Sequence, residues 1–364
     1  MLLFFKIRMQ SDQTIMLTKE EIEKIKSQEI QKDDKVSVTI VNWNGGEYIE
    51  KCLRSLEKQT HKNMEIIVVD NNSTDESIKI LERYSSKIKL IQNNHNLGFS
   101  KAHNQAIKAA TGKYIMPLNF DVTLDPNFIY EMLKAIKFSS EIGMASGKLY
   151  KKKDDKNRII DTTGITMNNM YPGDRGENHI DKGEYDSYEY IFGASGAAPL
   201  LKKEMLEDIK ADGEYFDEDF VYYVEDVDLC WRAQIAGWKC IYTPYAIGYH
   251  ERGATRKEDD TIKKGYYVIG YRNRYCTIFK NSFSSTILKK FFRIVLRETY
   301  FYSSQFLGFN FYVFRVPFAF LKMLPAMIKK RRLTMAKKRV CADYMEKFFF
   351  NQSLLGALKQ CLLK

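Results

Sequence analysis

Four alternations of a β-branched run and a helical segment occupy residues 36–118 of this chain. The predicted strands are Val36–Val41, Met64–Val69, Lys87–Ile91 and Tyr114–Leu118. Between them apolar residues recur with helical spacing, as at Ile49, Cys52 and Leu53, and 100–111 is predicted as a further helix. Strands that alternate with helices build a parallel sheet covered on both faces. The predicted fold class is therefore α/β, with a mostly parallel central sheet flanked by helices.

Polar residues follow three of these strands at the point where each strand ends. The clusters are Asn42–Gly46, Asp70–Asp75 and Asn119–Asp121. In parallel sheets the carboxyl ends of the strands meet at one edge, and ligands bind just beyond it. We therefore expect the clusters to converge on a ligand site. The sequence has no Gly-x-Gly-x-x-Gly and no Walker loop, which argues against a dinucleotide-binding domain and a P-loop ATPase.

The acidic stretch Tyr215–Arg232 runs into an apolar helical segment and has two interpretations. Its ionisable residues are Asp217, Glu218, Asp219, Glu225, Asp226, Asp228 and Arg232. Acids at a helix N-terminus are stabilised by the helix dipole, which accounts for one or two of them. Adjacent carboxylates at the rim of a core, such as Glu225 and Asp226, are also candidates for a general base. Asp228 is spaced to pair with Arg232 one turn later, so we expect a structural role for it.

Residues 141–210 show a less regular pattern. Asp161–Ile165 and Tyr171–Gly176 are predicted as loops, and the acidic stretch Gly176–Tyr190 as a mobile segment. The small residues of Gly193–Ala198 let a ligand or a helix approach the backbone closely. Further on, His250 follows an apolar strand. A lone histidine is more often a surface or core residue than a ligand, so His250 becomes a site candidate only beside other motifs.

Positive charge is concentrated near the C-terminus. The chain has a net charge of +11, but residues 285–364 alone hold 16 Lys or Arg against 3 Asp or Glu. Segments such as Ile287–Arg297 and Phe314–Arg332 mix large apolar faces with basic residues, which is typical of helices at an anionic membrane interface. A basic helical subdomain packed on the body is the alternative. No recognised nucleic-acid motif is present, so nucleic acid is not an expected partner.

These patterns divide the chain into an N-terminal extension over 1–34, an α/β domain over 35–275 and a basic amphipathic helical region over 276–364. The extension is predicted to hold a polar helix over 18–32, with Thr18 and Glu21 as a capping box. Six scattered cysteines without a Cys-x-x-Cys pair predict reduced, cytosolic thiols. Neither a signal peptide nor an uncharged apolar stretch of about 18 residues is expected.

Eight short motifs follow one another along the chain. They are Val36-Ser-Val-Thr-Ile-Val-Asn-Trp-Asn-Gly45, Val69-Asp-Asn-Asn-Ser-Thr-Asp75, Asn96-Leu-Gly-Phe99 with Asn104, Leu118-Asn-Phe-Asp121, Gly193-Ala-Ser-Gly-Ala-Ala198, Phe216-Asp-Glu-Asp-Phe220, Glu225-Asp-Val-Asp-Leu229 with Trp231-Arg232, and Pro244-Tyr-Ala246 with His250. In this order they resemble the family 2 inverting glycosyltransferases of the GT-A fold, in particular the bacterial rhamnosyltransferase-like branch. The resemblance covers about residues 36–275.

The resemblance implies metal-dependent transfer of a sugar from a nucleotide diphosphate donor to an acceptor hydroxyl. Inversion needs a base; the family motif assigns it to Asp226, with Glu225 orienting base or acceptor. A cation neutralises the departing diphosphate, and Asp121 with His250 would hold Mg²⁺ or Mn²⁺. The family's Asp-x-Asp motif has an amide here at its first position, Asn119, which is therefore assigned to the sugar or ribose.

The same resemblance assigns the nucleotide site. Asp70 and Asn71 would hold the base and ribose, Val41 and Trp43 would line the base pocket, and Asn104 belongs to the same set. Many uridine users carry a second Asp where this chain has Asn71, and the amide is compatible with thymine. The expected donor is dTDP-rhamnose, with UDP-hexoses as the alternative.

The expected acceptor is a glycan or a lipid-linked sugar in bacterial surface polysaccharide assembly, reached in the cytoplasm or on the inner face of the membrane. Two other classes remain open. A sugar nucleotidyltransferase would carry a Gly- and Arg-rich loop after its first strand, where this chain has Asn42–Gly46. A catalytically inactive binding module would not need Asp121, Asp226 and His250.

Overall fold

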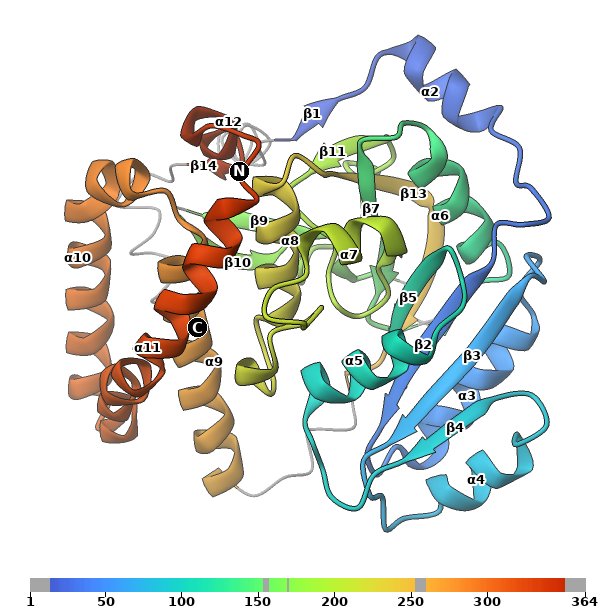
Figure 1. Ribbon diagram of the computed structural model, residues 1–364, viewed down its shortest axis with the longest axis horizontal. Coiled ribbons are helices and arrows are strands. Elements are labelled where there is room, and N and C mark those ends of the chain that lie inside the picture. Colours follow the sequence, from blue (N-terminus) through green and yellow to red (C-terminus); the bar gives the residue numbers. More distant parts are fainter. Residues whose placement is uncertain (1–13, 153–156, 169, 253–259, 351–364) are drawn as a thin grey trace.

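The computed structural model describes residues 14–152, 157–168, 170–252 and 260–350. Within them, one sheet of 11 strands forms the centre of the molecule (Figure 1). Nine strands lie in the order β1 (Ile15–Met16), β11 (Glu189–Ile191), β13 (Lys239–His250), β7 (Ile142–Tyr150), β12 (Leu200–Lys202), β5 (Tyr114–Asn119), β2 (Val36–Asn42), β3 (Met64–Asp70) and β4 (Lys89–Gln92). The other two are β6 (Val122–Leu124), which pairs with β13, and β8 (Ile160–Thr162), which pairs with β7.

The predicted parallel half of the sheet is confirmed, because β4, β3, β2 and β5 all pair in parallel. The connecting helices are α3 (Gly46–Glu57), α4 (Ser77–Arg83) and α5 (Phe99–Ala109). Val38 of β2 shares a buried cluster with Leu53 of α3, whereas Val69 of β3 shares the other large cluster with Ala106 of α5. Helices therefore cover both faces, as buried parallel strands require. The third predicted strand begins two residues late, at Lys89, because the N–H of Lys87 closes a turn after α4.

The remainder of the sheet is mixed. β12 runs antiparallel to β5 and β7, while β13 runs parallel to β7. β13 is one strand over Lys239–His250, with an irregular register between Tyr242 and Ile247. The helices of this half are α6 (Phe128–Lys137), α7 (Lys203–Ile209) and α8 (Glu225–Ile235). α8 begins at the adjacent carboxylates of the acidic stretch, as predicted.

Two segments predicted as loops contain strands. β8 extends the main sheet, and β9 (Ile165–Asn168) forms a small second sheet with β10 (Tyr171–Asp174) and β14 (Phe349–Phe350). The loop prediction was wrong because proline and glycine in β10 signalled a turn, whereas an edge strand tolerates both. The acidic stretch Gly176–Tyr190 is anchored, since Asp181 and Asp186 both pair with the buried Lys148.

The described part of the N-terminal extension packs on the body. Its helix α2 (Lys19–Lys26) is shorter than predicted but has the predicted capping box. The N–H of Glu21 donates to Thr18 Oγ1 (3.2 Å), and the N–H of Thr18 donates to Glu21 Oε2 (2.7 Å). Ile25 is fully buried, and β1 adds an antiparallel strand beside β11.

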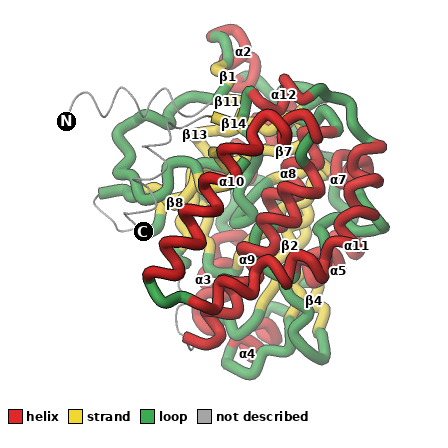
Figure 2. The backbone as a smooth tube through the Cα atoms, turned by 90° about the vertical axis from the view of Figure 1, so that its left-hand side faces the viewer, coloured by secondary structure: helices red, strands yellow, loops and turns green. Residues whose placement is uncertain are grey.

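The C-terminal region is helical, with α9 (Asp260–Asn281), α10 (Ser284–Leu307), η3 (Phe311–Phe314), α11 (Arg315–Ala336) and α12 (Ala342–Glu346). α9 and α11 pack side by side near α8, and α10 lies on the outside of the molecule (Figures 1 and 2). The expected boundary at residue 275 falls inside α9. Among the described residues one helix, Phe311–Ala336, is long and apolar enough to cross a membrane by length and composition.

Candidate active site

The strand ends that carry polar clusters meet at one edge of the sheet, as predicted. Asn42 lies opposite Asp70 in the β2–β3 pair, and Val41 lies opposite Asn119 in the β2–β5 pair. The side-chain amide of Asn42 donates to Asp70 Oδ1 (2.7 Å). Val41 and Trp43 are half-buried at this edge. Most of the residues that the resemblance assigns to the nucleotide are therefore neighbours.

Asp70 and Asn71 are buried and order the loops around them. Asp70 accepts hydrogen bonds from the N–H (3.0 Å) and the hydroxyl (2.6 Å) of Ser73. Asn71 Oδ1 accepts from the amide of Asn93 (2.9 Å), and Asn71 Nδ2 donates to the carbonyl of Gly98 (3.2 Å). The two side chains thus fix both loops that follow β3 and β4.

Asn104 lies elsewhere than the other predicted nucleotide residues. It is fully buried on α5 and faces the acidic stretch. Its Oδ1 accepts from the N–H of Phe216 (2.9 Å), and its Nδ2 donates to the carbonyl of Phe216 (2.8 Å) and to Glu218 Oε1 (3.1 Å). Both polar atoms are engaged within the chain. Asn104 therefore positions residues 216–218, and its assignment to the nucleotide stays a prediction.

Asp121 and His250 lie together, just after β5 and at the end of β13. His250 Nε2 is 3.3 Å from Asp121 Oδ1, and His250 Nδ1 is 2.8 Å from Oδ2 of the buried Asp161. Arg252 extends the series, with Nε 2.7 Å from Asp161 Oδ1 and Nη2 donating to Asp174 Oδ2 (2.8 Å). Paired charges therefore connect Asp121 with Asp174 on the small sheet.

This arrangement fits a divalent cation at Asp121 and His250. A carboxylate on one ring nitrogen of a histidine directs the other nitrogen toward a metal, and Asp161 occupies that position. Burial lowers the pKa of His250, but the hydrogen bonds and charges of Asp121 and Asp161 outweigh it and raise the pKa to about 9. A cation would replace this proton, because a ligating nitrogen is unprotonated. Within the described residues no three His, Cys, Asp or Glu side chains are grouped to hold a metal ion.

Glu225 and Asp226 form the first turn of α8, and the small-residue motif packs against the second of them. Asp226 Oδ2 accepts from the N–H of Gly196 (2.7 Å), and Oδ1 accepts from the N–H of Val227 (2.7 Å). A Cβ at position 196 would lie 3.0 Å from the Cβ of Asp226, so a larger residue would displace the carboxylate. Gly193–Ala198 therefore positions Asp226.

The two adjacent carboxyl groups differ in their tendency to ionise. Burial raises the pKa of Glu225 to about 8, and the negative charge of Asp226 adds to the effect. Glu225 Oε2 is buried and has no hydrogen-bond partner among the described residues. Burial also raises the pKa of Asp226, but the N–H groups of Gly196 and Val227 oppose the shift. Asp226 is therefore the member of the pair that ionises first.

The segment Val221–Val224, which we call the base loop, leads from η1 (Glu218–Phe220) into α8. Its first, third and fourth residues have φ angles of 61°, 68° and 71°. Such backbone costs a non-glycine residue about 1–3 kcal/mol and persists only where the surroundings impose it. Asn273 of α9 donates to three carbonyls in and before the loop (2.7–2.9 Å), and the N–H of Phe99 donates to the carbonyl of Val221 (2.8 Å). Helices α5 and α9 therefore set the approach to Glu225.

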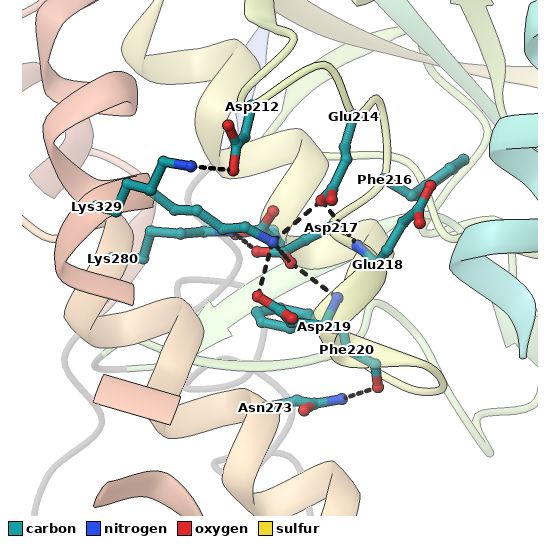
Figure 3. Close-up of polar contacts among 12 residues, drawn as sticks. Asp212, Glu214, Phe216, Asp217, Glu218, Asp219, Phe220, Asn273, Lys280 and Lys329 are labelled. Carbon is teal, nitrogen blue, oxygen red and sulfur yellow. Dashed lines mark hydrogen bonds and ion pairs between the residues drawn. The ribbon is translucent and has the colours of Figure 1, made fainter. Parts of the chain in front are cut away.

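Three other acids of the stretch, Asp217, Asp219 and Asp228, pair with lysines of the C-terminal helices (Figure 3). Lys330 of α11 is buried, pairs with Asp217, and lies 3.0 Å from Glu214 Oε2 and 2.8 Å from Asp219 Oδ2. Lys280 of α9 pairs with Asp217 too and is 2.8 Å from Asp228 Oδ1. The predicted pair of Asp228 with Arg232 is confirmed at 2.9 Å. The geometry thus separates Glu225 and Asp226 from acids that hold the structure together.

Sequence reasoning missed Asp161, Asp174 and Arg252, as well as Lys280 and Lys330. The two aspartates lie in segments interpreted as loops, and Arg252 meets them across 91 and 78 residues of chain. No local pattern indicates such pairs. For the lysines a signal existed, because a basic C-terminal region and an acidic stretch in one chain predict mutual contact.

Comparison with known proteins is consistent with this geometry. The family model described as Glycosyl transferase family 2 matches residues 37–208. The amylovoran biosynthesis glycosyltransferase AmsB of Erwinia amylovora is 30% identical over 245 residues, which cover 64% of this chain and 75% of that protein. The uncharacterized protein y4gI of Sinorhizobium fredii is 24% identical over 219 residues, which cover 57% of this chain but only 23% of that protein.

Among solved structures, GalNAc-T7 with UDP, GalNAc and Mn²⁺ is similar with a TM-score of 0.50 and 15% sequence identity. The alignment covers 65% of this chain and 48% of that chain. At this identity the likeness concerns the fold alone. It extends to the mostly parallel sheet and its flanking helices.

Proposed function

Because this chain belongs to glycosyl transferase family 2 and has the GT-A fold, we propose that it transfers a sugar with inversion from a nucleotide diphosphate to an acceptor hydroxyl. The observation that carries the proposal is the electrostatic connection between the two halves of the site. The charge of Asp174 contributes to the raised pKa of Asp226, and Asp174 is joined through Arg252 and Asp161 to His250. The base candidate and the metal candidates thus belong to one set of interacting charges.

In the proposed reaction Asp226 removes the proton from the acceptor hydroxyl. The oxygen then attacks the anomeric carbon opposite the diphosphate, and the bond from that carbon to the phosphate oxygen breaks with its electron pair on the diphosphate. Glu225, protonated at neutral pH, donates a hydrogen bond to the acceptor or to Asp226. Asp121 and His250 would hold Mg²⁺ or Mn²⁺, which supplies positive charge to the departing diphosphate.

We assign the donor to the edge of the sheet where β2, β3 and β5 end. Asp70 and Asn71 would hold the base and ribose, Val41 and Trp43 would border the base, and Asn119 would contact the sugar. Asn71 carries an amide, which is uncharged, where many uridine users carry a second Asp. We therefore choose dTDP-rhamnose as the first donor to test and a UDP-hexose as the second. A sugar nucleotidyltransferase is the alternative activity, and family membership argues against it.

We further propose that the enzyme works in the cytoplasm on the inner face of a membrane, where lipid-linked acceptors of polysaccharide assembly are found. Large apolar side chains are exposed along α10 and where it turns into α11; Phe292 on α10 is 83% exposed, and Leu307 and Phe309 at the turn are 76% and 79% exposed. Exposed basic residues on the same helices include Arg293 and Arg315. Met327 and Lys330 of α11 are buried against the body, which favours an interfacial position over a spanning one.

Donor screening of the purified protein tests the proposal. Release of nucleotide is measured with dTDP-rhamnose, UDP-hexoses and GDP-mannose, with Mn²⁺ or Mg²⁺ and with excess chelator. We expect release from one donor and its loss in chelator. Turnover of a sugar 1-phosphate with a nucleoside triphosphate would instead support the nucleotidyltransferase, and full activity in chelator would contradict the metal assignment.

A further inference from the structure

We propose that Tyr223 and Tyr266 form a platform on which a pyranose ring of the acceptor lies during transfer. The inference rests on the proposed function and names the acceptor subsite of that site. Tyr223 belongs to the base loop and is 45% exposed, although Phe220 and Glu225 on either side are buried. An aromatic ring is thus partly exposed immediately before the carboxylates.

The ring of Tyr223 lies against α9. Its centroid is 6.1 Å from that of Tyr266, with the rings nearly perpendicular at 73°. Gly270 follows Tyr266 by one helical turn, and a Cβ at Gly270 would lie 3.8 Å from the Cβ of Tyr223. The ring of Tyr222 also meets Tyr266, at 5.7 Å. Tyr223 therefore lies over the face of α9 formed by Tyr266 and Gly270.

The backbone of the loop holds Tyr223 in this position at a cost in conformational energy. Its φ of 68° is unfavourable for a tyrosine, and the bond from Asn273 to its carbonyl (2.9 Å) fixes that conformation. Strain of this kind concentrates at ligand and catalytic sites, where geometry is selected over stability. A tyrosine needed only for packing would be buried without such strain.

The base loop lies between the sites proposed for the donor and the acceptor. Tyr223 is three residues before Asp226, a separation of at most about 11 Å of extended chain. On the other side, the Tyr222 hydroxyl donates to Asn96 Oδ1 (2.8 Å), and Asn96 accepts from the amide of Asn71 (3.2 Å). The loop thus lies between the residues assigned to the nucleotide and the base that activates the acceptor.

A sugar ring is the ligand that this surface fits. One face of a pyranose carries mainly C–H groups, which pack flat on an aromatic ring, while its hydroxyls remain at the edge. A platform beside Asp226 would orient one acceptor hydroxyl toward its carboxylate. The other hydroxyls of the sugar would then not each need a hydrogen bond from the protein. The same surface would favour pyranose acceptors over acyclic alcohols.

Acceptor kinetics test the platform. With the nucleotide sugar selected by donor screening, nucleotide release is measured against methyl pyranosides of glucose, galactose, rhamnose and N-acetylglucosamine, with glycerol as an acyclic alcohol. Tyr223→Ala and Tyr266→Ala should raise the acceptor KM about three- to tenfold, the range of aromatic contacts, and raise the donor KM less. Tyr223→Phe should restore the wild-type acceptor KM. Tyr245→Ala is the matched control, because Tyr245 is 49% exposed on β13.

Tyr223→Leu separates recognition from packing, since it keeps an apolar side chain on the loop and removes the flat ring. A raised acceptor KM in this variant, with an unchanged melting temperature, supports the platform. An unchanged acceptor KM in the Leu and Ala variants overturns the platform while the proposed function stands. If the wild-type protein turns over no nucleotide sugar, the proposed function itself fails and the platform with it.

Discussion

Glu225 and Asp226 are adjacent, yet their surroundings give them different proton affinities. Asp226 has two backbone N–H donors, whereas one oxygen of Glu225 is buried without a hydrogen-bond partner among the described residues. Hydrogen bonds to the charged form favour ionisation, and desolvation disfavours it. Asp226 is thus the carboxylate able to accept a proton, while Glu225 keeps its own proton. This difference supports the proposal that Asp226 is the base.

Replacing Asp226 by Asn should remove the base and leave the fold intact, because the amide oxygen still accepts from the N–H of Gly196. We expect kcat to fall by about 10²–10⁴, the usual contribution of a general base. Donor KM should change little. Steady-state kinetics check both values. If Asp226→Asn remains active and Glu225→Gln does not, the roles within the pair are reversed.

Glu225 should make stability depend on pH in a defined direction. Its pKa is about 8 in the folded chain against an ordinary 4.5, so between these values the folded state keeps a proton that the unfolded state releases. The free energy of unfolding therefore falls as pH rises through this window. Glu225→Gln removes that dependence, and its melting temperature relative to wild type should rise from about pH 5 to about pH 8. A difference that stays constant with pH would contradict the buried, protonated state.

Short motifs in the sequence led to Asp121, Asp226 and His250 as proposed site residues, but the motifs did not show which residues hold them in place. Motifs preserve the spacing of residues that act together near strand and helix ends. Asp161 and Arg252 meet across 91 residues, and neither lies in a pattern that distinguishes it from a surface charge. Supporting charges of this kind follow from the tertiary arrangement alone.

At the level of elements, the C-terminal helices are part of the scaffold of the site. α9 holds the base loop through Asn273, and α9 and α11 neutralise the acids before it through Lys280 and Lys330. These lysines and two of their partners, Asp217 and Asp228, are almost fully buried, so solvent screens these ion pairs little. The helices therefore determine where α8 begins.

Lys330→Met should destabilise the protein strongly. The substitution leaves Glu214, Asp217 and Asp219 with one buried cation fewer, and breaking a buried ion pair costs about 3–5 kcal/mol. Lys329→Met is the matched control, since Lys329 pairs with Asp212 at the surface and its side chain is 63% exposed. The control should change stability by less than about 1 kcal/mol. Chemical denaturation measures both, and equal effects would show that the cluster contributes little.

The strands that the sequence predicted correctly are those buried on both faces, such as β2 and β3. Their continuous β-branched runs are compatible with few structures other than a buried strand. β10 was missed because it contains the turn residues Pro172 and Gly173, and β8 was missed because it is only 3 residues long. β9, the partner of β10, also pairs with β14 at residues 349–350, which lies far along the chain.

At the scale of the whole molecule, the basic C-terminal region has two roles. Its inner side neutralises the acidic stretch, and its outer side exposes the apolar residues around the α10–α11 turn. The sequence offered these as alternatives, a packed subdomain or a membrane surface, because charge counts do not show which lysines point inward.

The exposed side should bind anionic vesicles, with affinity that falls as salt rises, because each basic residue near an anionic leaflet contributes about 1 kcal/mol before screening. Deleting the tail would also remove Lys330, so substitutions at the surface are the sharper test. Replacing Leu307, Phe309 and Phe311 by Ser should abolish sedimentation with vesicles. Ile180→Ser, at an exposed site on the body, is the control. A wild-type protein that ignores such vesicles at low salt would contradict the membrane role.

The stereochemistry of transfer tests the central claim most directly. The purified enzyme, its donor and a methyl pyranoside acceptor are followed by proton NMR from the first turnover, and the anomeric coupling of the new linkage is compared with that of the donor. The account predicts inversion in a single step, with the signal absent in Asp226→Asn. A product with the donor's configuration would show that Asp226 does not act as the base of a direct displacement.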